Sequence, residues 1–170
     1  MLKEIEARLK AEGLATGWAA SGVGAPMDQL IVGLADDEHG RSRSLWITPL
    51  PGLEGELGPG LGLVQFLVEL PFKPIPAARP DLGELLLLLN NLVPLGAFGV
   101  RPAVAEAVIL FRYVLVHGPD PAGAGGAALD VVLLISYLLD QFGGLIESIA
   151  TGSRTLAQAR ADLQLEQQPP

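Results

Sequence analysis

Apolar residues recur at helical spacing in three parts of the chain. Leu2, Ile5 and Leu9 share one side of a short segment whose intervening positions are mostly charged, and Gly13 follows as a helix end. Proline at the first turn and acidic residues just after it are typical of a helix start, and they open a leucine-rich segment. The two further helices are expected at residues 80–91 and 127–149.

Five other segments have the composition and spacing of β-strands. They are rich in branched and aromatic residues and are separated by turns that contain glycine, proline or clustered polar residues. The expected strands are residues 30–34, 45–48, 61–72, 98–100 and 107–117. The pattern is clearest in the third, where Val64, Phe66, Val68, Leu70 and Phe72 alternate with other residues and share one face.

The order of these segments is α-β-β-β-α-β-β-α. Consecutive strands joined by short turns pair antiparallel, and the helices are then free to pack on the sheet. The sequence therefore predicts an α+β fold with a five-stranded antiparallel sheet, in one domain spanning residues 1–152. Within it, the Gly- and Ala-rich residues 13–27 are expected to form a flexible connection, and residues 153–170 a C-terminal tail that is partly helical.

Two segments carry more apolar residues than one covered face needs. Residues 108–117 are mostly apolar on both faces, and five consecutive leucines at 85–89 surround the whole circumference of their helix. Either the chain's own loops and tail cover the excess, or it forms a dimer or partner surface, because monomers seldom expose large apolar patches. The residues expected on such a surface are Leu85, Leu86, Leu88, Leu89, Leu110, Arg112, Val114 and Val116.

Composition narrows the classes of function. The chain has 170 residues, no cysteine and a net charge of −8, without a cluster of lysines or arginines. The charge disfavours nucleic acid as a partner, and the lack of cysteine excludes disulfides and thiolate chemistry. No secretion signal is recognisable, and the most apolar windows are too short to span a bilayer, so we expect a cytoplasmic protein that does not bind membranes.

Candidate chemistry is sparse. The segment DDEHG at residues 36–40 groups acidic residues with His39, but consecutive side chains of one turn do not close around an ion alone, so a solvent-exposed turn is expected. The glycines at residues 123–126 precede a helix without the lysine of a phosphate-binding loop and are expected to form a flexible loop. No serine lies in a nucleophile motif. We therefore expect no enzyme activity, no catalytic or metal-binding residues and no cofactor.

One block of the chain resembles a known family. The leucine-rich helix ends in asparagine, a short segment with glycine and phenylalanine follows, and the last strand contains an arginine beside a tyrosine. The matching residues are Asn90 and Asn91, then Leu95, Gly96, Ala97 and Phe98, and finally Phe111, Arg112 and Tyr113. In these features, and in element order over residues 30–152, the chain resembles the bacterial YbjN-like family, whose fold is similar to type III secretion chaperones. The Gly/Ala-rich segment and the tail depart from that pattern.

The resemblance implies a chaperone-like module that binds another protein. In such a module a dimeric α+β fold holds a segment of a partner polypeptide on its apolar surface. The alternative is a dimeric regulatory or signalling protein that is controlled by a ligand or by its oligomeric state. Both hypotheses expect a homodimer, and neither identifies the partner.

Overall fold

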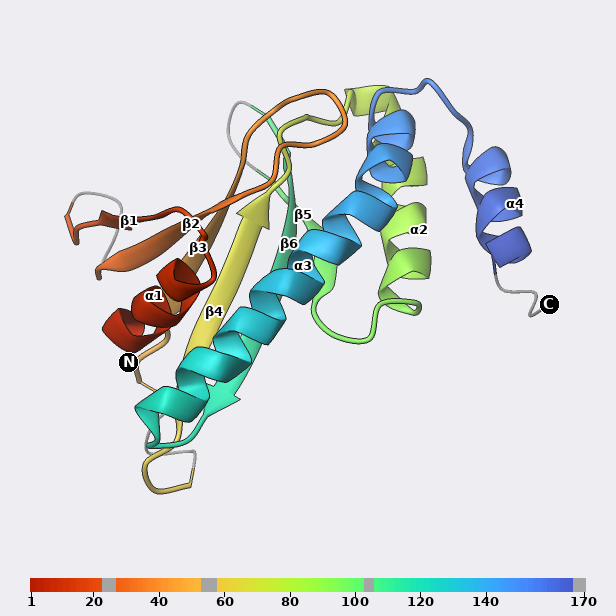
Figure 1. Ribbon diagram of the computed structural model, residues 1–170. Coiled ribbons are helices and arrows are strands. Elements are labelled where there is room, and N and C mark those ends of the chain that lie inside the picture. Colours follow the sequence, from red (N-terminus) through yellow and green to blue (C-terminus); the bar gives the residue numbers. More distant parts are fainter. Residues whose placement is uncertain (23–26, 53–57, 103–105, 167–170) are drawn as a thin grey trace.

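The computed structural model describes residues 1–22, 27–52, 58–102 and 106–166, and it contains one sheet with helices packed on it (Figure 1). The α+β class, with an antiparallel sheet, is confirmed. The elements are α1 (Leu2–Ala11), β1 (Thr16–Ala19), β2 (Gln29–Leu34), β3 (Arg43–Pro49), β4 (Gly62–Glu69), the 3-10 helix η1 (Pro76–Ala78), α2 (Arg79–Asn90), β5 (Ala97–Arg101), β6 (Val108–His117), α3 (Pro121–Ala150) and α4 (Leu156–Glu166).

The sheet has six strands rather than five, in the order β1-β2-β3-β4-β6-β5, and every pairing is antiparallel. The additional strand, β1, lies within the segment 13–27 that was expected to be a flexible connection. Its sequence, TGWA, is too short and too rich in small residues to show alternation, and it is ordered by pairing with β2. Residues 23–26 of the same segment lie outside the described residues.

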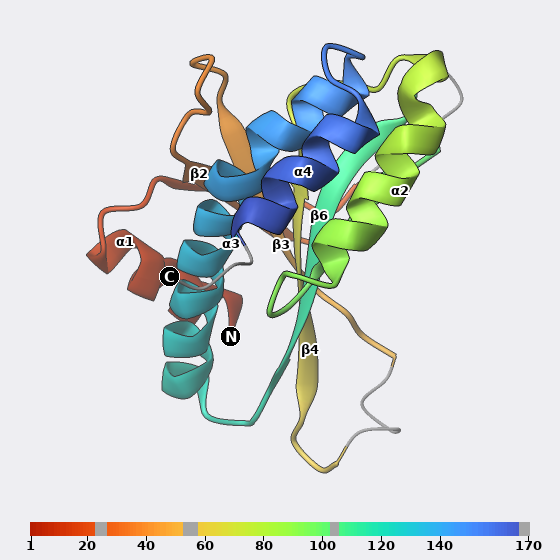
Figure 2. The same cartoon turned by 90° about the vertical axis from the view of Figure 1, so that its right-hand side faces the viewer.

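The helices form layers on the sheet. In Figure 1, α3 crosses in front of β4 and β6, with α1 beside its N-terminal half and α2 near β5. Turned by 90°, the molecule shows α4 lying over α2 and α3 as an outer element (Figure 2). The predicted tail is therefore helical over residues 156–166 and packs on the rest of the fold.

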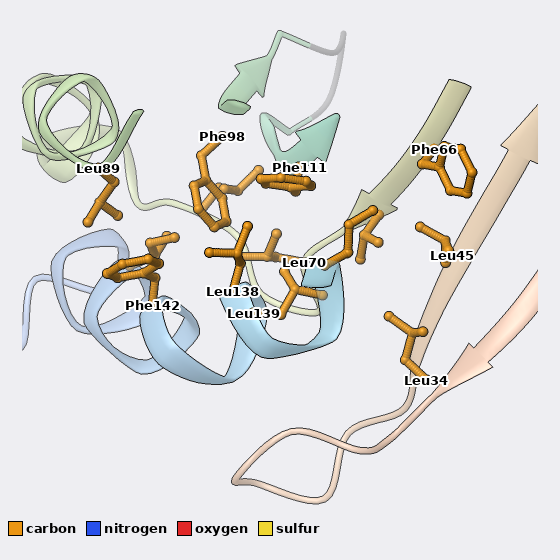
Figure 3. Close-up of a cluster of buried hydrophobic side chains, with 14 of the residues drawn as sticks. Leu34, Leu45, Phe66, Leu70, Leu89, Phe98, Phe111, Leu138, Leu139 and Phe142 are labelled. Atoms are coloured by element: carbon orange, nitrogen blue, oxygen red, sulfur yellow. The ribbon is translucent and has the colours of Figure 1, made fainter. Parts of the chain in front are cut away.

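A continuous apolar core fills the space between the sheet and the helices. Leu45, Phe66 and Phe111 of the strands belong to this core together with Leu138 and Phe142 of α3 (Figure 3). Phe98 packs edge-on against Phe111, with ring centroids 4.9 Å apart. Most other core residues are aliphatic, since aromatic residues are only 5% of the chain.

Helix α3 begins six residues earlier than its sequence pattern predicts. Asp120 caps it by accepting hydrogen bonds from the backbone N–H groups of Ala122 and Gly123, and Pro121 takes the first helical position. The glycines at residues 123–126 are therefore helical and not a flexible loop. A Cβ atom on Gly125 would lie 3.4 Å from both Arg8 Cβ and Glu4 O, so a small residue here lets α1 approach α3 closely.

By length and composition alone, α3 could also cross a membrane. Half of its most apolar stretch is buried inside this fold, where it contacts α1, α2 and β6. Such packing is typical of the central helix of a folded domain.

Candidate functional site

The most conspicuous surface of the described chain is the face of the sheet that no described helix covers. We call it the open face. Alternate residues of the central strands project from it and are partly or fully exposed, whereas their neighbours are buried under the helices. Its apolar members are Ile31, Trp46, Leu63, Leu67, Val108, Leu110, Val114 and Val116.

The strand register places several of these side chains in one row. Ile31 is opposite Trp46, Trp46 is opposite Leu67, and Leu67 is opposite Arg112. Directly opposed side chains in an antiparallel sheet touch across the strands. The row therefore forms a continuous apolar band across β2, β3 and β4 that ends on a guanidinium group.

Half of the surface predicted from the sequence lies on the open face. Leu110 and Val114 are half-buried there, Arg112 is exposed, and Val116 exposes 53% of its surface. All four belong to β6, the strand that is mostly apolar on both of its faces. The absence of a described helix over them agrees with the expectation that the chain's helices cover only one face.

The other half of that predicted surface is not a surface. Leu85, Leu86 and Leu89 are buried in the core, and Leu88 is partly buried against it. The leucine-rich helix α2 is covered by β5 and α3 and, on a further side, by α4 from the same chain. Of the leucines in α2, only Leu87 points outward, with 69% of its surface exposed. The tail therefore supplies the cover that a second subunit was expected to provide at this helix.

Polar groups on the open face are mostly paired among themselves. Arg101 of β5 forms an ion pair with Glu69 of β4, across the intervening strand β6. Arg112 donates a hydrogen bond from Nε to Gln65 Oε1 at 2.5 Å. Among the described strands, Glu69, Arg101 and Arg112 are the charged side chains that project from this face. The face is therefore close to neutral, although the whole chain has a net charge of −8.

The β5 edge of the sheet is partly closed by a side chain. Asn90, at the end of α2, donates from Nδ2 to Phe98 O at 2.9 Å and accepts at Oδ1 from Phe98 N at 2.8 Å. These are the bonds that an added strand would make with Phe98. Edge strands protected in this way resist pairing with another chain, so the open face is the better candidate for protein binding.

A second candidate site is a cleft of about 310 Å³ between the β2–β3 turn and the C-terminal half of α3. Leu70, Phe72 and Leu139 give it apolar walls, and Gly143 and Gly144 leave part of the α3 side without side chains. The remaining lining is largely charged: Asp36, Asp37, Glu38, Arg43, Asp140 and Glu147.

Arg41 ties the β2–β3 turn to α3 beside this cleft. Its guanidinium donates two hydrogen bonds to the carboxylate of Glu147, at 2.7 and 2.5 Å, and one to Asp37 at 2.7 Å, and it lies 5.3 Å from the Phe72 ring centre. The bonds to Glu147 raise the pKa of Arg41 above its ordinary range. Burial alone would raise the pKa of Asp37, but hydrogen bonds from Arg41 and from the His39 N–H outweigh it and lower that pKa.

Arg43 holds the other side of the turn. The residue is only 5% exposed. Its guanidinium donates a hydrogen bond to the carbonyl oxygen of Ala35 at 2.7 Å and pairs with Asp140 of α3 at 2.7 Å. A buried guanidinium requires such partners. Both arginines are therefore engaged in fastening the turn and are structural groups of the cleft.

A carboxylate from α3 lies beside the acidic residues and His39 of this turn, and the local sequence pattern does not show this proximity. Glu147 of α3 lies close enough to Glu38 and His39 for one ligand atom from each to fall within 4.8 Å of the others. The three side chains could hold a divalent cation in principle. However, Glu38 and His39 are exposed, and both oxygens of Glu147 already accept bonds from Arg41. The turn is thus better explained as an anchored hairpin.

Comparison with known proteins adds no family. No protein-family model matches the chain, and no curated protein matches its sequence. The fold that is established is α+β, with a six-stranded antiparallel sheet and four α-helices among the described residues. The resemblance to the YbjN-like family remains a hypothesis.

Proposed function

We propose that the protein is a non-enzymatic, chaperone-like module that holds a polypeptide segment of a partner protein on the open face. The observation that carries this proposal is the band of apolar side chains on a sheet face that no described helix covers. Exposed apolar patches rimmed by polar groups are typical of protein-binding surfaces. The resemblance to the YbjN-like family, and through it to type III secretion chaperones, favours the same class of function.

The energetics of the open face suit reversible binding. Removing about 100 Å² of apolar surface from water contributes roughly 2.5 kcal/mol. Trp46 and Leu67, adjacent in the centre of the row, are partly exposed and offer apolar contact, and the paired polar groups around them lose few hydrogen bonds when covered. A segment with exposed apolar side chains would gain from this surface without needing a specific sequence.

The test is suppression of aggregation. Reduced α-lactalbumin is mixed with the wild-type protein, and light scattering is followed with time. We expect the wild type to suppress scattering and Leu67→Glu to suppress it several-fold less, because the charge interrupts the apolar row. The matched control is Leu133→Glu on the solvent side of α3, where the leucine is 55% exposed. Equal suppression by wild type and Leu67→Glu would contradict the proposal.

The second candidate is a dimeric regulatory protein that responds to a small ligand. The cleft beside the β2–β3 turn favours it, because a volume of about 310 Å³ with apolar walls and charged rims is sufficient for a small molecule. A ligand that binds only the folded state stabilises it and raises the melting temperature as the ligand concentration rises above its dissociation constant. A melting-temperature screen of small amines and carboxylic acids, repeated with Gly143→Leu to fill the cleft, tests this candidate. A ligand effect that persists in the variant would exclude the cleft.

A further inference from the structure

We propose that, in the absence of a partner, the open face is occupied by the open face of a second copy of this chain, so that the two sheets stack face to face. The inference rests on the proposed function in one respect, namely that the open face is an interaction surface. The inference adds that a second copy of the chain covers the open face when no partner is bound, and it gives the arrangement of the two copies.

The dimensions of the face fit this occupant. Strands in a sheet are spaced about 4.8 Å apart and rise about 3.3 Å per residue. Six strands, of which the central β2, β3 and β4 have six, seven and eight residues, therefore present a face on the order of 600 Å² before side-chain relief is counted. A standard protein interface buries about 800 Å² on each partner. A single extended peptide would cover only part of such a face, whereas a second sheet covers it entirely.

The charge of the face also selects a second copy. Two chains of net charge −8 repel each other, and they can associate only through a surface that carries little of that charge. On the open face Glu69 is paired with Arg101, and Arg112 remains as one additional positive charge. The acidic groups of the cleft, by contrast, lie at the β2–β3 turn and α3. Identical open faces can therefore meet without strong repulsion.

The strand order indicates how two copies fit. Strand β4 lies between β3 and β6, and Trp46, Leu67 and Arg112 follow one another across these strands. A two-fold axis that runs along β4 between the sheets exchanges the positions of β3 and β6. It places Leu67 against its own copy and the Trp46 indole against Arg112 of the second copy. Arg112 then gains an aromatic face in place of the water it loses.

The same arrangement bears on the chaperone-like role. If the two copies use the surface that holds a polypeptide segment, the dimer shields its own apolar band until a partner competes for it. A covalently locked dimer should then be unable to suppress aggregation, and release of the lock should restore suppression.

The chain contains no cysteine, so a single introduced cysteine reports its own surroundings. We would prepare Leu67→Cys, Gln65→Cys and the control Leu133→Cys and treat each with a bis-methanethiosulfonate reagent that has an ethylene spacer. Stacked sheets lie about 10 Å apart, which exceeds the roughly 6 Å between Cα atoms of a disulfide, so a spacer is needed. The bridge is removed again by a reducing agent.

We expect Leu67→Cys to form a crosslinked dimer at least ten-fold faster than Leu133→Cys. Gln65→Cys should behave like Leu67→Cys, because both residues lie along β4 on the open face, and it keeps the test valid if one variant fails to fold. Crosslinking at neither open-face position, or equally fast crosslinking at Leu133→Cys, would overturn the inference. Either result would overturn the inference even if the protein is a dimer, because the dimer interface would then lie on another surface.

The aggregation assay separates the two proposals. Monomeric protein that still loses suppression on Leu67→Glu would overturn the dimer and support the proposed function. A crosslinked Leu67→Cys dimer that suppresses aggregation as well as its reduced form would support the dimer and overturn the open face as the polypeptide site. Suppression that appears only on reduction supports both.

Discussion

Gly96 and Phe98 form a corner that joins α2 to β5. Gly96 has a φ of +73°, and a Cβ atom there would lie 2.4 Å from Cζ of Phe111, so both the backbone conformation and the available space require glycine. Phe98 turns into the core, and Asn90 brackets its backbone. The corner is therefore a structural element of the fold.

Replacing Gly96 tests this corner. Gly96→Ala should lower the free energy of unfolding by about 2–4 kcal/mol, because it adds left-handed strain and a clash with a buried ring. Gly99→Ala is the matched control, since Gly99 lies within β5 without a positive φ and its nearest neighbour would be 3.7 Å away. Urea unfolding measures both. A loss of the same size in both variants would argue against a special role for Gly96.

At the residue scale, local sequence predicts backbone turns better than it predicts which side chains bond to each other. The glycine that follows the leucine-rich helix marks the turn at Gly96, whereas Gly99 is an ordinary strand residue. The bracket made by Asn90 depends on where a helix end meets a strand in space. The pairing of Arg41 with Glu147 joins residues 106 positions apart, and local pattern does not show it.

Among the elements, the β2–β3 turn depends most on a long-range polar contact. Glu147→Gln should destabilise the protein by about 1–2 kcal/mol, a moderate value because the Arg41–Glu147 pair is partly exposed to solvent. Glu38→Gln, in the same cleft but exposed, should change stability little. Urea unfolding at neutral pH distinguishes the two. Equal stability of Glu147→Gln and wild type would show that the turn is not fastened through this pair.

The lowered pKa of Asp37 gives this turn a pH dependence with a defined sign. A carboxylate with a depressed folded-state pKa contributes stability that is fully present above its ordinary value of 3.8 and is lost as the pH falls through the lower folded value. The contribution of Asp37 is therefore constant near neutrality and disappears only in acid.

Helix α4 covers leucines that were expected to meet a second subunit. Ala159 is fully buried on its inner side, and Ala157 is exposed on its outer side. Ala159→Asp buries a charge, so it should detach α4, lower stability by about 1–3 kcal/mol and remove hydrogen-exchange protection from residues 156–166. Ala157→Asp should leave both unchanged. If Ala159→Asp keeps the protection of α4, the helix is not held by this contact.

The elements that local pattern did not predict share a cause. Strand β1 and the first turn of α3 are rich in glycine and alanine, and they are fixed by neighbours: β2 pairs with β1, and α1 lies against Gly125. Apolar periodicity is weak in such segments, so propensity alone favours a loop. The weak pattern of Leu156, Ala159 and Leu163 predicted a helix in the tail, but not that it would lie on α2 and α3.

For the whole molecule, the apolar excess of the sequence separates into two parts. Apart from Leu87, the leucines of α2 are covered within the chain, and the excess on β6 faces outward on the open face together with Trp46 and Leu67. Composition predicts that an excess exists. Its location depends on which helices reach which face, and this follows from the topology of the folded chain.

Sedimentation equilibrium of the wild-type protein, beside Leu67→Glu and Leu133→Glu, tests most directly whether the open face joins two copies of the chain. The account predicts a mass of twice 17.8 kDa for the wild type and for Leu133→Glu, and a single-chain mass for Leu67→Glu. A wild type that remains a monomer at every concentration, or a Leu67→Glu variant that dimerises as well as the wild type, would contradict it.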